Sequence, residues 1–169
     1  LTVISQILEW LKDEMIDENG GYYSSMDADS EGVEGKYYVW KPEEIENVLS
    51  ETDAKIFNQY YDISKTGNWE GNSIPNIIMK KSSLSTLLKI PESEISSSLE
   101  KSRLAIKEHR KSRIAPGTDD KIIVSWNGLM ISSLAKVSAF LGDKEYFEIA
   151  DRAVSFIVDK MSKEDGSLN

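Results

Sequence analysis

Two consecutive helical segments in the last third of the sequence constrain the fold most strongly. Residues 125–141 place apolar side chains on nearly every side of a predicted helix, which is typical of a helix buried all round. Residues 144–161 place them on one face only. Gly142 and Asp143 between them are typical of a helix C-terminus followed by the N-cap of the next helix. A buried inner helix followed by an amphipathic outer helix predicts the helical-hairpin unit of a toroid or solenoid.

The rest of the sequence predicts more helix and little strand. Apolar residues from Val3 to Met15 recur at helical spacing, and Asn19-Gly20-Gly21 ends that helix. Four more helices are expected at about 42–50, 52–61, 83–89 and 91–112. Residues 22–40 have ends rich in β-forming residues around an acidic, glycine-containing middle, which predicts a hairpin. The fold class is therefore mainly α, with a small β-hairpin insertion near residues 22–40.

Composition excludes several classes of protein. The 169 residues contain no cysteine and one histidine, so neither a disulfide scaffold nor a cysteine-based metal site is expected. Residues 1–60 carry 14 acidic and 4 basic side chains, which disfavours binding to nucleic acid. The basic stretch 101–113 is interspersed with glutamate and is interpreted as a solvated helix face. Without an apolar run of roughly 20 residues or a signal peptide, we expect a cytoplasmic protein without a membrane partner.

The acidic segment 26–35 is the first candidate site. Its four carboxylates repel one another, so a cation, a substrate or plain solvation has to offset them. Asp27, Asp29 and Glu31 begin a calcium-loop spacing, but position twelve is Tyr38 instead of a glutamate. A general acid and base pair and a solvated hairpin tip both remain open.

Two further segments combine polar and aromatic residues. In Gly67–Asn72, two glycines flank Trp69 and Glu70, so the indole ring either stacks on a sugar or anchors the loop to the core. In residues 116–128, two aspartates and a Trp-Asn-Gly sequence lie where a loop enters the most apolar helix. The aspartates there either cap the helix or line a pocket, and Asn127 needs partners because an unpaired buried amide costs on the order of 1–3 kcal/mol.

Three blocks of the sequence resemble one protein family. GGYYSSMDADSEGVEGKYYVW, GNWEGNSIP and DDKIIVSWNGLMISSLA occur in this order. They are similar to the thioredoxin-domain-containing proteins related to spermatogenesis-associated protein 20, over nearly the whole chain. The resemblance implies part of an (α/α)6 toroid similar to six-hairpin glycosidases and N-acylglucosamine 2-epimerases. Because the chain has no Cys-x-x-Cys motif and no βαβ start, we expect residues 1–169 to be a single partial toroid segment of a longer protein, without the thioredoxin-like domain.

The resemblance also implies a carbohydrate-type pocket at the toroid mouth. The matching positions are Asp27, Asp29, Glu31, Tyr38, Trp40, Trp69, Glu70, Asp119, Asp120, Lys121, Trp126 and Asn127. We expect the catalytic groups to be among the four aspartates, with Asp27 or Asp29 as the general base. Asp119 or Asp120 is then the general acid or accepts a sugar hydroxyl, and the other eight residues contact the substrate. The related epimerases transfer protons with histidines, whereas this sequence has only His109, outside these motifs.

The resemblance therefore implies a glycosidase- or epimerase-like domain that binds or processes a sugar, and we expect no metal or cofactor. This prediction requires the acidic turn and the helix entrance at Trp126 to meet in one cleft. The alternative is a non-catalytic scaffold or protein-interaction domain that accompanies a thioredoxin-like domain. Because part of a toroid leaves apolar helix faces uncovered, we expect the rest of the parent toroid or a second copy to cover them.

Overall fold

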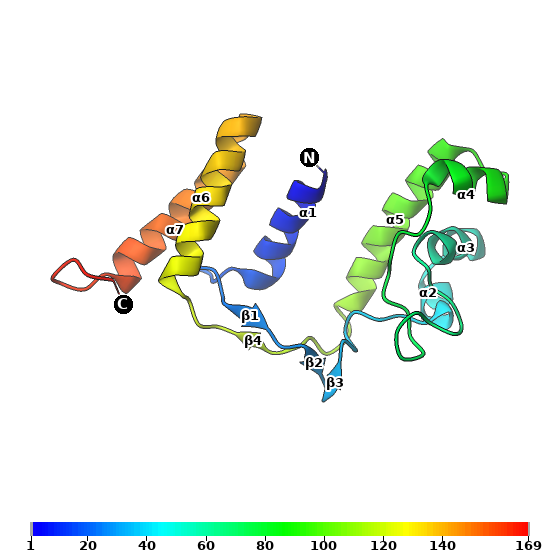
Figure 1. Ribbon diagram of the computed structural model, residues 1–169, viewed down its shortest axis with the longest axis horizontal. Helices are drawn as coiled ribbons and strands as arrows, with labels where there is room; N and C mark the ends of the chain where they lie inside the picture. The colour runs from blue at the N-terminus through cyan, green and yellow to red at the C-terminus, as the bar shows by residue number, and fades with distance from the viewer. Residues whose placement is uncertain (1, 169) are drawn as a thin grey trace. The chain divides into compact units, whose positions relative to one another are not determined.

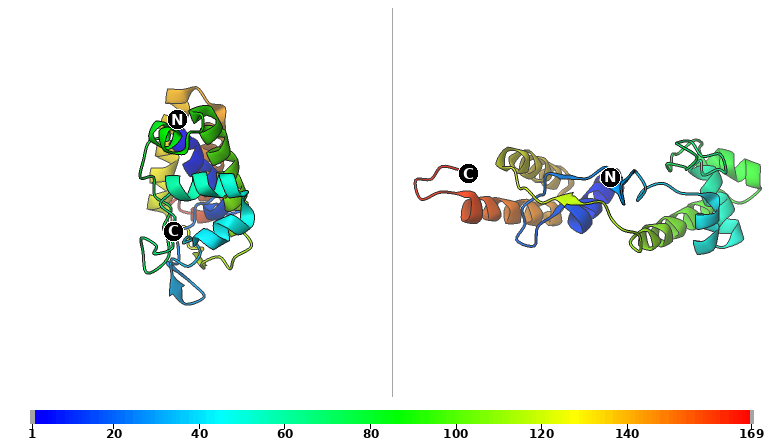
Figure 2. Two further views of the ribbon diagram at one scale, coloured as in Figure 1. Left: turned by 90° about the vertical axis from the view of Figure 1, so that its right-hand side faces the viewer. Right: turned by 90° about the horizontal axis from the view of Figure 1, so that it is seen from below.

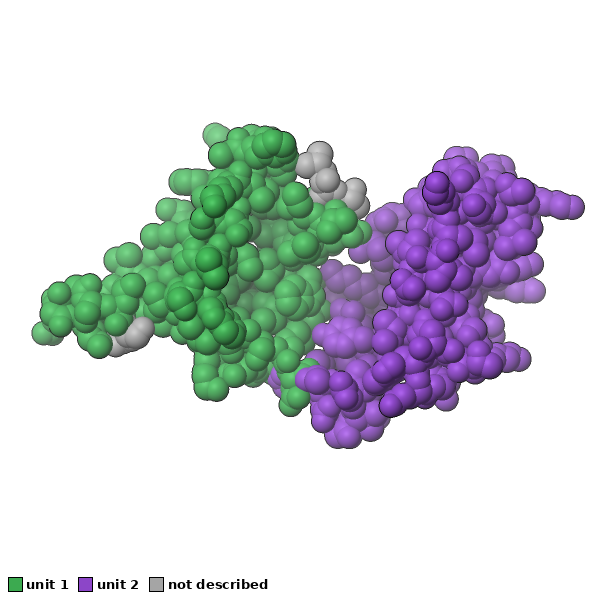
Figure 3. Space-filling model, in the orientation of Figure 1, with its two compact units in different colours: residues 1–27, 118–169 green, residues 28–117 purple. Residues whose placement is uncertain are grey.

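The computed structural model describes residues 2–168, and the chain divides into two compact units. Unit 1 comprises residues 1–27 and 118–169, and unit 2 comprises residues 28–117 (Figure 3). The chain is mainly α-helical with a small β insertion, which confirms the predicted fold class. The toroid arrangement concerns both units together and stays a prediction.

Unit 1 is built on α1 (Thr2–Trp10), α6 (Val124–Leu141) and α7 (Lys144–Phe156) (Figure 1). α1 and α7 continue into the π-helical turns Leu11–Met15 and Ile157–Met161. The predicted connection between α6 and α7 is confirmed: Gly142 has a left-handed φ of 68°, and the Asp143 carboxylate accepts from the Glu145 N–H at 2.9 Å.

One apolar cluster holds unit 1 together. α6 and α7 lie side by side (Figure 2), and α1 contributes to the same cluster. Its buried members are Leu8, Leu11, Met15, Tyr22, Leu134, Tyr146, Ala150 and Ala153. Because these residues come from the first and last parts of the sequence, the cluster brings the two ends of the chain into one core.

α6 is buried on one side only, so the prediction that it is buried all round is wrong for this chain. Trp126, Leu129 and Phe140 are 53%, 70% and 88% exposed, whereas Leu134 is buried. The buried side packs on α1 and α7, and the described residues of unit 1 place nothing over the opposite side. Even α6 is not long and apolar enough to cross a membrane, and neither is any other helix within residues 2–168.

Within residues 2–168, each unit contains one pair of short strands. In unit 1, β1 (Ser25–Met26) pairs antiparallel with β4 (Thr118–Asp119). In unit 2, β2 (Asp29–Ser30) and β3 (Val33–Glu34) form the predicted hairpin. This hairpin is tighter than the predicted one, because the β-rich ends pair elsewhere, Tyr22 with Ile16 and Trp40 with Ser73.

Unit 2 contains α2 (Pro42–Val48), α3 (Glu51–Tyr60), α4 (Lys81–Leu88) and α5 (Glu92–Arg110), within a few residues of the predicted bounds. Ser50 caps α3, since its hydroxyl accepts from the Asp53 N–H at 3.2 Å. Two apolar clusters lie between these helices. Their buried members are Trp40, Ile45, Ala54, Phe57, Ile63 and Ile106 in one, and Ile56, Tyr60, Leu84, Ile95 and Leu99 in the other.

Candidate functional site: a pocket in unit 2

A pocket of about 700 Å³ opens on unit 2, a size typical of small-molecule sites. Its walls come from the β2–β3 hairpin, the segment that leads into α2, the loop around Trp69 and the chain just after α5. The lining residues are Ser30, Glu31, Val33, Glu34, Lys36, Tyr37, Val39, Lys41, Glu44, Trp69, Glu70, Asn72, Ser112, Arg113 and Ile114. Charged groups, one indole ring and a few aliphatic side chains therefore share one concave surface.

Two Glu-Gly turns of the same geometry contribute to this pocket. Glu31–Gly32 joins β2 to β3, and Glu70–Gly71 joins Trp69 to Asn72. All four residues have positive φ, between 48° and 77°, as a two-residue type I′ turn requires. A left-handed conformation costs a residue other than glycine about 1–2 kcal/mol. Holding two glutamates in this conformation beside one cavity makes both turns candidates for function.

The loop that carries Trp69 is rigidly held. The Asn68 amide donates to the Ile74 carbonyl at 3.0 Å and to an Asp62 carboxylate oxygen at 3.1 Å. Its side-chain oxygen accepts from the Ile74 N–H at 2.8 Å. The N–H groups of Asn68 and Trp69 both donate to the Asn72 carbonyl at 2.9 Å. Side chain and backbone thus fix both ends of the turn.

Two glycines allow the close packing of this loop. A Cβ atom on Gly67 would lie 2.2 Å from the Asn72 carbonyl oxygen, so only glycine fits there. A Cβ atom on Gly35 would lie 3.2 Å from the Trp69 ring, so the half-buried indole packs against the hairpin backbone. Trp69 is therefore anchored and also lines the pocket, and its stacking on a sugar stays a prediction.

Arg113 holds the part of the pocket wall that residues 36–39 form. One guanidinium nitrogen donates to the carbonyls of Lys36, Tyr37 and Val39, at 3.4, 3.1 and 2.8 Å. The other nitrogen pairs with Glu44 at 2.8 Å, and the guanidinium lies 3.7 Å from the centre of the Trp40 ring. Burial lowers the pKa of Arg113, and the neighbouring Glu44 opposes that shift.

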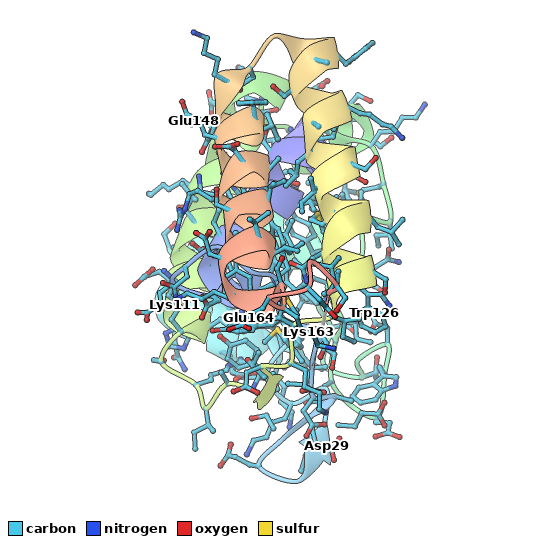
Figure 4. All side chains as sticks on the ribbon, turned by 90° about the vertical axis from the view of Figure 1, so that its left-hand side faces the viewer. Asp29, Lys111, Trp126, Glu148, Lys163 and Glu164 are labelled. Atoms are coloured by element: carbon cyan, nitrogen blue, oxygen red, sulfur yellow. The ribbon has the colours of Figure 1, made fainter. Side chains whose placement is uncertain are left out.

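Of the six predicted site residues in unit 2, Glu31, Trp69 and Glu70 line the pocket. The other three lie outside the lining that the structure describes. Asp29, which is labelled in Figure 4, is exposed on β2, opposite Glu34. Trp40 is 3% exposed beneath Arg113 and has a packing role here.

Tyr38 contacts its neighbours on the wall instead of the cavity. Its ring meets the Tyr37 ring edge-on with 5.0 Å between centroids, and the Arg110 guanidinium lies 5.0 Å from each ring. Tyr38 lies in the turn formed by residues 35–38, where its N–H donates to the Gly35 carbonyl at 2.9 Å.

The other predicted residues belong to unit 1. Asp27, Asp120 and Lys121 are exposed, and Trp126 is exposed at the first turn of α6 (Figure 4). Asp119 accepts from Lys121 Nζ at 3.1 Å, and hydrogen bonds from Lys121 lower the pKa of the Asp119 carboxyl. A common cleft for these residues and the acidic turn is a statement about both units together, and it stays a prediction.

Asn127 is 1% exposed, and its amide is fully engaged within unit 1. Its oxygen accepts from the Tyr22 N–H at 2.7 Å. Its nitrogen donates to the carbonyls of Tyr22 and Ile123, each at 3.0 Å. The side chain thereby pairs with the backbone of a residue 105 positions away, which meets the need for partners that the sequence indicates.

Sequence reasoning missed several pocket residues. Glu34 lies inside the acidic segment 26–35 and Lys36 follows it directly, so proximity alone is a signal for them. Arg113 falls in the basic stretch interpreted as solvated, and only the end of the helical pattern near 112 sets it apart. Among the described residues, no three histidine, aspartate or glutamate side chains are grouped so that they could hold a metal ion.

Comparison with known proteins finds related sequences. No protein-family model matches the chain. An uncharacterised protein of Caenorhabditis elegans is 28% identical over 178 residues, and human spermatogenesis-associated protein 20 is 27% identical over 184 residues. The mouse spermatogenesis-associated protein 20 is also 27% identical. Each alignment covers 92% of this chain and 23–24% of the relative, so the chain spans about a quarter of the length of the curated relatives it matches. The chain is thus similar, along most of its length, to one part of spermatogenesis-associated protein 20.

Proposed function

We propose that the pocket of unit 2 binds a carbohydrate, with Trp69 as the stacking surface. The observation that carries this proposal is an immobilised, half-buried indole in the wall of a cavity of about 700 Å³ whose other walls are rich in charged groups. An indole offers a large flat apolar face, which suits the apolar face of a sugar ring. Carboxylates and cationic side chains around it supply acceptors and donors for hydroxyl groups.

The rigidity of the site supports the same proposal. Trp69 is held by the Asn68 hydrogen bonds on one side and by contact with Gly35 on the other. A ligand therefore does not have to order this ring on binding, which favours affinity. Arg113 holds the wall formed by residues 36–39 in the same way.

A catalytic form of this proposal requires the second group of motifs. The roles expected for Asp27 or Asp29 as base, and for Asp119 or Asp120 as acid, need both units at one cleft. Inverting glycosidases hold their carboxyl groups about 6.5–9.5 Å apart, and retaining enzymes about 5–5.5 Å. The likeness to glycosidase-type toroids implied by the sequence favours this extension.

Titration with neutral sugars tests the binding proposal. The chain is titrated with a panel of monosaccharides and oligosaccharides, and calorimetry and tryptophan fluorescence monitor the binding. We expect a saturable response from at least one sugar, lost in Trp69→Ala and partly retained in Trp69→Phe, because phenylalanine keeps a smaller stacking face. Trp10→Phe is the matched control, since Trp10 lies on α1 and does not line this pocket. Absence of any response, or equal affinity in Trp69→Ala, would contradict the proposal.

A second role, protein docking, is supported by unit 1. Leu129 and Phe140 on α6 and Phe147 on α7 are 70%, 88% and 57% exposed. Apolar side chains this exposed along a helix pair are typical of surfaces that another protein segment covers. We expect the remainder of a longer parent protein or a second copy of the chain to cover them.

A further inference from the structure

The charged groups that line the pocket of unit 2 are not fully paired with one another. Four are carboxylates and three are cations. Glu44 pairs with Arg113 at 2.8 Å. Glu31 pairs with Lys36 at 2.6 Å. These two pairs use two of the carboxylates and two of the cations.

Glu34 and Glu70 are the carboxylates that remain. Neither forms an ion pair or a side-chain hydrogen bond within residues 2–168. Lys41 is the remaining cation of the lining, and in the same part of the chain its ammonium group likewise has no carboxylate partner. The unpaired groups of the pocket therefore carry a net charge of −1, and two carboxylates stand against one ammonium.

We propose that the ligand of this pocket is an amino sugar, whose ammonium group is received by Glu70 or Glu34 while its ring stacks on Trp69. This inference rests on the proposed carbohydrate binding and adds the charge of the ligand to it. An N⁺–H···O⁻ hydrogen bond is roughly twice as strong as a neutral one, so an ammonium group gains more from an unpaired carboxylate than a hydroxyl does. An acidic sugar is disfavoured, because its carboxylate would face both glutamates.

The position of Glu70 adds geometry to the charge argument. Glu70 follows Trp69 directly and has a left-handed φ of 48° within the Trp69–Asn72 bridge. The turn therefore fixes the carboxylate-bearing residue next to the stacking ring. A sugar ring on the indole thus has an acceptor of negative charge beside it.

A pair of disaccharides that differ only at C2 tests the inference. The chain is titrated by calorimetry with the β-1,4-linked disaccharide of glucosamine, and separately with that of glucose. The experiment is run near pH 6, below the pKa of about 7.7–8 typical of amines of this kind, so that the amines are protonated. The N-acetylated disaccharide is the third probe, because it keeps the nitrogen and removes the charge. We expect the charged disaccharide to bind about tenfold more tightly than either neutral one at low salt, and this preference to shrink at high salt.

Isosteric variants assign the effect to the pocket. In Glu34→Gln/Glu70→Gln the preference for the charged disaccharide is expected to fall to about twofold or less. Glu43→Gln on α2, exposed and outside the pocket, is the matched control and keeps the preference. Equal binding of the charged and neutral disaccharides, or a preference unchanged in the double variant, overturns the inference and leaves the carbohydrate proposal standing. No binding of any of the three disaccharides overturns the inference, and the carbohydrate proposal falls as well if the whole sugar panel gives no response.

Discussion

Unit 2 and unit 1 differ in how their apolar side chains are grouped and in how their loops are fastened. Unit 2 packs its helices around two apolar clusters and fastens its loops with polar contacts, above all the part-buried ones of Arg113 and the exposed ones of Asn68. Unit 1 has one apolar cluster and leaves Leu129 and Phe140 exposed on the opposite side of α6. An apolar helix sequence therefore indicates that a helix needs partners, and the described residues of unit 1 cover only one side of α6.

The polar contacts of the two units also differ in purpose. In unit 2 they hold the wall of a pocket, because Arg113 and Trp69 belong to its lining. In unit 1 the buried amide of Asn127 joins two distant segments of the chain and leaves no group for a ligand. We therefore expect a small molecule to bind at unit 2, whereas the amide of Asn127 joins chain segments in unit 1.

Removal of Arg113 is the strongest test of the statement that polar contacts fasten unit 2. Arg113→Ala removes the hydrogen bonds to three carbonyls and leaves Glu44 without its cation, so we expect a loss of about 3 kcal/mol in the free energy of unfolding. Arg113→Lys keeps the charge without the planar fork, and we expect it to lose about half as much. Denaturant titration measures both.

Lys111→Ala is the control for Arg113. Lys111 is two residues away, and its side chain is 55% exposed in an ion pair with Glu108. A surface pair of this kind contributes at most about 1 kcal/mol. Equal losses in Arg113→Ala and Lys111→Ala would show that the buried contacts of Arg113 do not hold the wall.

Two glycines of the Trp69 loop offer a matched pair of substitutions. Gly67→Ala places a methyl group against the Asn72 backbone at a φ of 69°, so we expect a loss of about 2–3 kcal/mol and a changed Trp69 fluorescence. Gly71→Ala meets no atom within 4 Å at a φ of 77° and should cost only about 1 kcal/mol. Thermal denaturation compares them, and equal losses would contradict the close approach at Gly67.

Asn127→Ala tests the polar contact of unit 1. The substitution leaves the Tyr22 N–H and carbonyl without their buried partner, so we expect a loss of about 2 kcal/mol in the free energy of unfolding. Sugar binding at the unit 2 pocket should not change, because Asn127 is not part of its lining. Loss of binding with unchanged stability would instead assign Asn127 to a binding site.

The pH dependence of stability provides a smaller test within unit 2. Hydrogen bonds from the Ser98 and Ser50 hydroxyls lower the pKa of Asp53. A lowered folded-state pKa contributes stability above the unfolded pKa of about 3.9, and this stability is lost as the pH falls through the folded value. Ser98→Ala should therefore cost about 1 kcal/mol at pH 7 and clearly less near pH 2. A cost independent of pH would exclude an effect through the ionised carboxylate.

Substitutions on the exposed face of α6 test whether unit 1 leaves an apolar surface for another protein segment to cover. They have the smallest expected effect on stability. We expect the wild-type chain to self-associate at high concentration, and Leu129→Glu/Phe140→Glu to shift it towards monomer in light scattering. The free energy of unfolding should change by less than about 0.5 kcal/mol, because both side chains are exposed. A wild-type chain that stays monomeric would contradict the expectation that a second copy covers this face.

Local signals in the sequence predict the helices of both units well. Apolar spacing predicts α1 and α5, and Gly142 with Asp143 marks the connection after α6, as the structure confirms. The acidic, glycine-containing segment predicts a hairpin, although the pairing of its ends depends on partners at Ile16 and Ser73 that local sequence does not specify.

The site is less predictable, because long-range contacts define it. Arg113 reaches carbonyl groups 74–77 positions away, and its only local signal is its place just after the end of the helical pattern near 112. Trp69 and Glu70 are found because an aromatic ring and a carboxylate between two glycines form an unusual local pattern. Glu44 has the sequence signature of a first-turn helix residue, and only the fold turns it towards Arg113.

The most direct measurement is a nuclear magnetic resonance titration that follows the four tryptophan indole signals of the ¹⁵N-labelled chain as sugar is added. The account predicts that the Trp69 indole and the backbone signals of Glu31 and Glu70 move together and saturate at one affinity. A matching shift at Trp126 would add the unit 1 motif to the same cleft. If the Trp69 signal stays in place while the sugar binds, the pocket of unit 2 is not the binding site.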